Sequence, residues 1–176
     1  MKGCPNVANG SDLSRTGNLP MFPGIFPDQL APIVRNGVDG KRELVMARWG
    51  MPGPPQFGGA PITNIRNVSS PHWRDWLGKH NRCIVPATSF CEYADTRPRK
   101  TPKWFALGQD RPWFAFAGLW TPWRGMRGPK GAPVDGQHEL FGFLHYGGER
   151  RRGPDPSQGH AGHPDDAGGG GFVAAG

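Results

Sequence analysis

Residues 49–92 read WGMPGPPQFGGAPITNIRNVSSPHWRDWLGKHNRCIVPATSFCE, and the rest of the chain is organised around them. Aromatic residues and prolines are mixed here with polar residues, and Asn64, Arg66 and Glu92 would each need a partner if buried. Such a mixture is poor material for an apolar core. A surface that gathers tryptophan, arginine, asparagine and one carboxylate is suited to holding a flat, negatively charged ligand.

Two strands are expected directly before this segment. Ala31–Arg35 and Glu43–Trp49 are joined by NGVDGK, whose Asn-Gly and Asp-Gly pairs favour a tight turn. The same pattern of short apolar runs between turn residues predicts five further strands, at Cys83–Val85, Ser89–Tyr93, Lys103–Leu107, Trp113–Leu119 and Glu139–Leu144.

One short helix is expected within the segment. It begins at Ser70-Pro71, an N-cap followed by proline at the first helical position, and it ends near Gly78. Trp73, Trp76 and Leu77 fall on one helical face at spacings of three and four residues. This spacing favours core packing for all three over contact with a ligand.

Glycine and proline dominate the remaining connections. Residues 51–61 contain too many of both for regular structure, and residues 121–137 read as a long, basic, flexible loop. The chain of 176 residues has 28 Gly and 20 Pro, which is too many for a helical bundle. We therefore predict one α+β domain: a curved or barrel-like, mainly antiparallel sheet with a few short helices.

Four blocks of the sequence resemble a known family. WGMP, NIRNV, RCIVPATSFCEY and FAGLW are similar, in order and spacing, to successive blocks of the SOS-response-associated peptidase (SRAP) family of abasic-site-processing proteins. The resemblance covers roughly Asn18 to Leu144. It implies a protein that binds single-stranded DNA and captures abasic sites as a thiazolidine crosslink through an N-terminal cysteine. It also implies a self-cleaving peptidase activity in the SOS response.

The resemblance assigns roles to three residues. Asn64 positions the opened sugar of the abasic site, and Arg66 clamps a neighbouring phosphate with its forked donors. Glu92 is the family's catalytic glutamate, placed to act as general acid and base. Without the resemblance, Asn64 reads as a turn-capping residue, Arg66 as a surface arginine and Glu92 as an exposed strand residue.

A second group of residues is predicted to hold the DNA strand. Trp49 either stacks on a base or belongs to the core, and Arg48 and Arg82 contact the backbone, because stacking and cationic contacts together hold single strands. Cys83, Cys91 and His80 have irregular spacing for a zinc site, so we expect two small buried cysteines, with no metal or cofactor.

Charge and cysteine content bound the partners. The net charge is +7, and residues 147–176 hold three of the 21 basic and four of the 14 acidic residues, which leaves 18 basic and 10 acidic residues before them. This excess favours a polyanion such as DNA. Three cysteines, no membrane-length apolar run and no signal-peptide core predict a cytoplasmic protein, expected to be a monomer.

Both ends of the chain depart from the family pattern. The sequence begins Met1-Lys2-Gly3-Cys4, so Cys4 lacks the free amine that a thiazolidine needs and is at most an ordinary thiol nucleophile. We expect residues 1–17 to be without structure. Residues 155–176 can be encoded by a nucleotide sequence that, when translated from one nucleotide later, begins IHPKAMPVILTTPEEV. This shifted translation resembles the family's next block. We therefore expect 145–176 to be a disordered, frameshifted tail.

Three functions follow from these observations. The core blocks favour an abasic-site-processing protein, while the two ends favour a non-catalytic single-stranded DNA-binding remnant or an inactive truncated product. The shifted tail also predicts that Val45, Phe116, Leu119 and Phe141 lack their usual cover, which would leave the core marginal.

Overall fold

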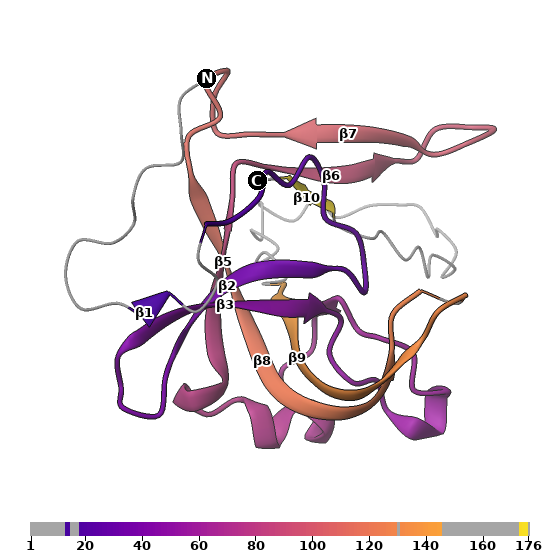
Figure 1. The fold of residues 1–176 in the computed structure, drawn as a ribbon. Helices are drawn as coiled ribbons and strands as arrows, with labels where there is room; N and C mark the ends of the chain where they lie inside the picture. Colours follow the sequence, from indigo (N-terminus) through magenta and orange to yellow (C-terminus); the bar gives the residue numbers. More distant parts are fainter. Residues whose placement is uncertain (1–12, 15–17, 130, 146–172, 176) are drawn as a thin grey trace, which may run out of the picture.

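The computed structural model describes residues 13–14, 18–129, 131–145 and 173–175. These residues form ten strands and three short 3₁₀ helices (Figure 1). The strands are β1 Leu13–Ser14, β2 Leu30–Asn36, β3 Arg42–Trp49, β4 Asn64–Ile65, β5 Arg82–Ala87, β6 Ser89–Ala94, β7 Thr101–Phe105, β8 Phe114–Arg127, β9 Val134–Leu144 and β10 Val173–Ala175, and the helices are η1 Pro55–Phe57, η2 Pro71–Trp76 and η3 Lys79–Asn81.

Five strands close into a barrel. The main sheet has the order β1-β3-β2-β5-β8-β9-β4, and an additional pairing of β3 with β9 joins its two sides. β3–β9, β1–β3 and β4–β9 are parallel pairs, and the neighbours from β3 through β2, β5 and β8 to β9 are antiparallel. The prediction of a barrel-like sheet with a few short helices is confirmed.

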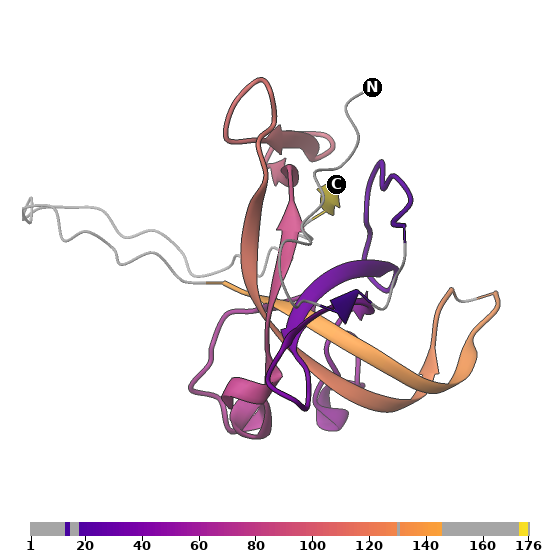
Figure 2. The same ribbon diagram turned by 60° about the vertical axis from the view of Figure 1, so that its left-hand side comes forward.

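A smaller sheet and a long hairpin extend from this barrel on different sides. β6 pairs with β7 and β10 in a three-stranded antiparallel sheet. The two views show this sheet at the top of the molecule and the curved β8–β9 hairpin (orange) reaching away to the lower right (Figures 1 and 2). Each of these extensions carries part of the sites described below.

The turn between β2 and β3 follows the sequence prediction. Gly37 N–H donates to the Lys41 carbonyl at 2.7 Å, and Gly40 N–H donates to the Gly37 carbonyl at 3.0 Å. Gly40 has a φ of +78°, a conformation that glycine adopts without steric strain. The Asp-Gly pair therefore closes the hairpin at the expected place.

The β8–β9 hairpin corrects the prediction of a loop at 121–137. β8 continues to Arg127 and pairs with β9 from Gly118↔Phe143 to Arg127↔Val134. Thr121 and Arg127 are buried, and Trp123 and Gly125 between them are partly buried, whereas Pro122, Arg124 and Met126 are exposed. The alternation of a strand is thus present, but its inward positions hold polar, glycine and arginine residues, so no apolar repeat marks it.

The predicted helix lies in the predicted place but is a 3₁₀ helix. Ser70 is its N-cap, without a side-chain cap hydrogen bond, and the helix ends at Trp76. Trp73 is buried, and Trp76 and Leu77 pack against the same core cluster. The predicted core role is confirmed for Trp73, whereas Trp76 and Leu77 are partly buried against that core.

Five residues near the two chain ends are described, and they form short strands. Leu13–Ser14 pairs with β3 and Val173–Ala175 pairs with β6, so these residues are strands and not irregular segments. Val45, Leu119 and Phe141 are at most 4% exposed and Phe116 is partly buried, although the shifted tail was expected to leave these four side chains uncovered. The rest of the predicted N-terminal segment and shifted tail lies outside the described residues.

None of the helices in the described ranges has the length and apolar character needed to cross a membrane.

Candidate functional site

Asn64 lies on β4, where the parallel pairing with β9 fixes its backbone. Its register partner is Phe143, whose N–H donates to the Thr63 carbonyl at 2.9 Å, and His145 N–H donates to the Ile65 carbonyl at 2.9 Å. The Asn64 side chain is partly buried, and its Nδ2 lies 3.5 Å from Thr63 Oγ1. Its Oδ1 is buried with no hydrogen-bond partner in the described chain.

Asn64 Oδ1 is one of six buried side-chain atoms that have no hydrogen-bond partner in the described chain. Leaving such a group without a donor costs about 1–3 kcal/mol, so it is rarely kept without a compensating role. Arg66, two residues further along, is exposed. We call residues 64–66 the β4 edge; it offers an acceptor that lacks a donor beside an exposed guanidinium.

Glu92 lies on the smaller sheet. It is partly buried on β6, opposite Lys103 on β7. A row of ring contacts leads from this strand towards the β4 edge: Phe90 to Phe116 at 5.6 Å between centroids, Phe116 to Phe143 at 4.9 Å, and Phe143 is the register partner of Asn64. No hydrogen bond or ion pair joins Asn64, Arg66 and Glu92 in the described structure.

Trp49 is a core residue and Arg48 makes structural contacts, while a contact of Arg48 with DNA remains a prediction. Trp49 is 0% exposed and donates its indole N–H to the Thr63 carbonyl at 3.3 Å, so neither ring face is open to a base. The Arg48 side chain is mostly buried; its Nη1 donates to the Asp28 carbonyl and its Nε lies 4.0 Å from Asp28 Oδ1. Trp49 therefore belongs to the core, the alternative that the sequence left open.

The remaining predicted residues have separate outcomes. Arg82 is exposed, and its Nε and Nη2 both lie 3.4 Å from the Leu77 carbonyl, so its contact with DNA remains a prediction. Cys4 lies outside the described residues. Cys83 and Cys91 are buried and free, and burial raises the pKa of the Cys83 thiol to about 12, which keeps it protonated and unreactive.

An ionic cluster around Asp28 was not predicted. Its Oδ1 lies 3.8 Å from Arg127 Nη1, and its Oδ2 accepts the Gly128 N–H at 2.8 Å. Arg127 Nη2 donates to the Gly50 carbonyl at 3.0 Å, and burial lowers the pKa of its guanidinium while Asp28 opposes that shift. The cluster fastens the end of β8 to the loop before β2 and to the end of β3.

This cluster borders a hollow of about 830 Å³, which we call the hairpin hollow. Its walls are the glycine- and proline-rich loop after β3, the helix η2 and the end of the β8–β9 hairpin. The side chains with aromatic, sulfur or charged groups that line it are Asp28, His72, Trp76, Trp123, Met126 and Arg127. None of the site residues predicted from the sequence lines it, although Trp76 was assigned to the core.

Known proteins resemble this chain in sequence and in fold. The profile of the family described as SOS response associated peptidase (SRAP) matches residues 14–138. No curated protein sequence matches the chain significantly. Among solved structures, a Bacteroides thetaiotaomicron protein is 22% identical with a TM-score of 0.48, over 66% of this chain and 50% of that one.

Two Bordetella bronchiseptica proteins are similar to the same degree. One is 20% identical with a TM-score of 0.47, over 72% of this chain and 61% of its own. The other, a phage-related protein, is 21% identical with a TM-score of 0.49, over 69% of this chain and 55% of its own. The chain thus spans 50–61% of the length of these three solved chains.

The fold and the matched region define a class: a small mixed β-barrel with an asparagine-arginine edge. The profile covers well over half of the sequence, so the chain belongs to the SOS response associated peptidase (SRAP) family. Membership of this family associates its function with the response to DNA damage.

Proposed function

We propose that this protein is an abasic-site-processing protein that binds single-stranded DNA at the β4 edge. The observation that carries the proposal is the buried, unpaired Oδ1 of Asn64 beside the exposed Arg66. Both residues fall within the family match, in the block NIRNV that resembles the family's Asn-x-Arg. A site that lacks a donor when empty gains one when its ligand arrives.

The chemistry of an abasic site fits this edge. Ring opening of the sugar produces an aldehyde and a hydroxyl, and a hydroxyl donates the hydrogen bond that Asn64 Oδ1 lacks. Arg66 presents a planar fork of donors to the adjacent phosphate. The absence of the base removes the bulk that would otherwise separate the sugar from the edge.

Glu92 supplies acid and base chemistry in this proposal. A partly buried carboxylate can accept and return the proton that moves when the sugar ring opens. In the family, an N-terminal aminothiol then condenses with the aldehyde to a thiazolidine with loss of water. Asn64 and Arg66 belong to the binding step of this proposal, so the proposal is tested by binding.

The experiment compares two labelled oligonucleotides, one intact and one with a central abasic site, at low and at high salt. We expect binding of both to weaken steeply with salt, because phosphate contacts release counterions. Asn64→Ala should reduce the preference for the abasic strand about three- to tenfold, as expected for one lost hydrogen bond, and should leave binding of the intact strand unchanged.

Asn67→Ala is the matched control. Asn67 is exposed, and its Oδ1 already accepts the Ser69 N–H at 3.1 Å, so its loss should not change the preference. Absence of binding at low salt would reject the proposal. Binding without preference for the abasic strand would favour the alternative, a non-catalytic single-stranded DNA-binding remnant.

A further inference from the structure

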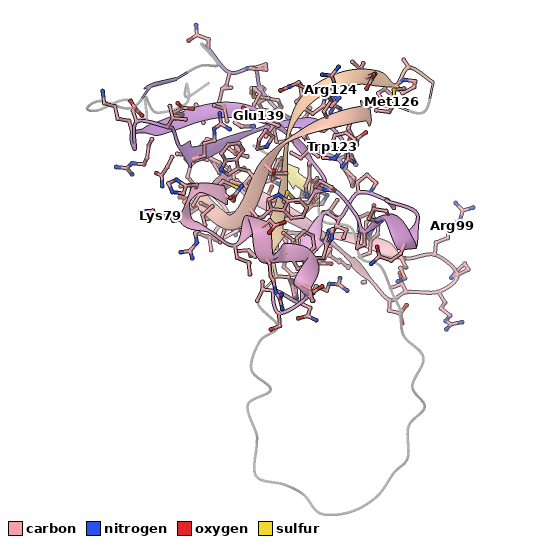
Figure 3. All side chains as sticks on the ribbon, turned by 90° about the horizontal axis from the view of Figure 1, so that it is seen from below. Lys79, Arg99, Trp123, Arg124, Met126 and Glu139 are labelled. Carbon is pink, nitrogen blue, oxygen red and sulfur yellow. The ribbon has the colours of Figure 1, made fainter. Side chains whose placement is uncertain are left out.

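The hairpin hollow has two aromatic walls on separate elements. Trp76 comes from η2, where His72 packs against it at 5.3 Å between ring centroids and is itself bonded to the Pro52 carbonyl at 2.9 Å. Trp123 comes from β8. Figure 3 shows Trp123, Arg124 and Met126 together on the hairpin, well apart from Arg99.

The Trp123 ring is held in place before any ligand arrives. Gly125 has a φ of +151°, and a Cβ at this position would overlap the Trp123 ring, so the glycine makes room for it. The Arg127 guanidinium lies 5.0 Å from the ring centroid, a favourable cation–π distance. A fixed ring loses little entropy when a second flat ring stacks on it.

Both walls also have unused hydrogen-bond donors. Trp49 and Trp120 donate their indole N–H groups to the carbonyls of Thr63 and His80. The corresponding groups of Trp76 and Trp123 have no acceptor among the described residues, and neither is buried. They remain available for the oxygen or ring-nitrogen acceptors of a ligand.

The charges around the hollow are compatible with a nucleic acid. Asp28, the one carboxylate in its lining, is compensated by Arg48, Arg127 and the Gly128 N–H. Arg74 and Arg124 are exposed next to the two walls, as are Asp75 and Asp135. Because these exposed charges balance, ring stacking is expected to contribute more here than phosphate contacts.

We propose that the hairpin hollow is a second nucleic-acid subsite, which takes an unstacked base of the strand whose abasic position lies at the β4 edge. This inference rests on the proposed function. The volume of about 830 Å³ lies in the usual range for ligand pockets. Pro61 lines the hollow and Asn64 is three residues further on, at most about 10 Å away along the chain. One strand can therefore occupy both sites.

The test moves a base-free spacer along the strand. In a thymidine oligonucleotide with one abasic site, each neighbouring base is replaced in turn by a tetrahydrofuran spacer. At one or two positions, the spacer should lower the affinity of the wild-type protein about tenfold, as expected when a base no longer stacks on an aromatic side chain. Trp123→Leu should lose the same factor with the full oligonucleotide and be insensitive to the spacer at those positions.

Two further variants separate stacking from folding. Met126 is 55% exposed, so Met126→Glu places a carboxylate in the hollow without disturbing the core and should also weaken binding about tenfold. Trp104, 49% exposed on β7 and outside the hollow, is the matched control, and Trp104→Leu should bind as the wild type does.

The outcomes are distinct. Wild-type affinity in both Trp123→Leu and Met126→Glu would overturn the subsite and leave the proposed function standing. Equal losses with full and spacer-substituted strands would also overturn it, because the effect would not depend on a base. Absence of any binding by the wild type would reject the proposed function, and the subsite with it.

Discussion

The β4 edge and the hairpin hollow lie close together in the chain but are built in opposite ways. At the edge, Asn64 keeps a buried acceptor without a donor and Arg66 is exposed. At the hollow, Asp28 lies within 4.0 Å of Arg48 and Arg127 and joins three parts of the fold, although its Oδ1 and Arg48 Nε also lack a hydrogen-bond partner in the described chain. The edge offers a neutral acceptor that takes part in no ion pair, whereas ion pairs hold the cluster at the hollow together before any ligand binds. Substitutions in the two regions should therefore change stability in opposite directions.

The largest effect is expected at the hollow. Asp28→Asn keeps the size of the side chain, and asparagine tolerates the φ of 66° found here, but it removes the negative charge from two largely buried arginines. Breaking such a pair from one side should lower the free energy of unfolding by about 3 kcal/mol. For a chain of this length that corresponds to a melting temperature roughly 6–12 °C lower, measured by calorimetry.

The matched control is Asp39→Asn, in the β2–β3 turn. Asp39 and Lys41 are about half exposed and their charged groups are 4.0 Å apart, so losing this pair should cost less than about 1 kcal/mol.

Thiol labelling of Cys83 shows how far the loss of stability in Asp28→Asn spreads through the barrel. If Asp28→Asn exposes Cys83 to alkylation at temperatures where the hairpin alone should open, the cluster supports the whole barrel and not just the hollow.

How much of this contrast the sequence foretold depends on the region. The β4 edge was found because Asn64 and Arg66 stand in a recognisable block, and the barrel because its strands carry apolar runs between turn residues. The hollow was missed because its ionic cluster joins residues about 100 positions apart, Asp28 and Gly128 among them. No local periodicity reports such a contact.

Residue type alone was also an unreliable guide, because the same side chain can pack in a core or contact DNA. Trp49 is equally suited to stack a base or to fill a core, and it lies in the core because the closure of β3 against β9 buries it. Arg48 was predicted to contact DNA, but its mostly buried side chain lies against Asp28. In the same way, the inward residues of β8 include glycine and arginine, so this strand was predicted as a loop.

The second-largest expected effect is a gain in stability at the β4 edge, opposite in sign to the loss expected for Asp28→Asn. Asn64→Leu replaces the unpaired amide with an apolar group of similar size, and it should raise the free energy of unfolding by about 1 kcal/mol while weakening the preference for abasic strands. The melting temperature should rise by roughly 2–4 °C. Asn67→Leu, at an exposed position, removes the hydrogen bond from Ser69 N–H and should therefore not raise the melting temperature, and it should leave the preference unchanged. A lower melting temperature in Asn64→Leu would mean that the edge is a structural element like the hollow.

The smallest effect concerns salt. If Arg66 and Arg124 each contact a phosphate from their separate regions, each alanine substitution should reduce the slope of log affinity against log salt by about 0.7. The double variant should lose about twice that amount, since effects at separate sites add. Arg99→Ala, on the β6–β7 turn, should not change the slope. If the double variant has the same salt slope as either single variant, both arginines act on one phosphate. The edge and the hollow would then be a single site.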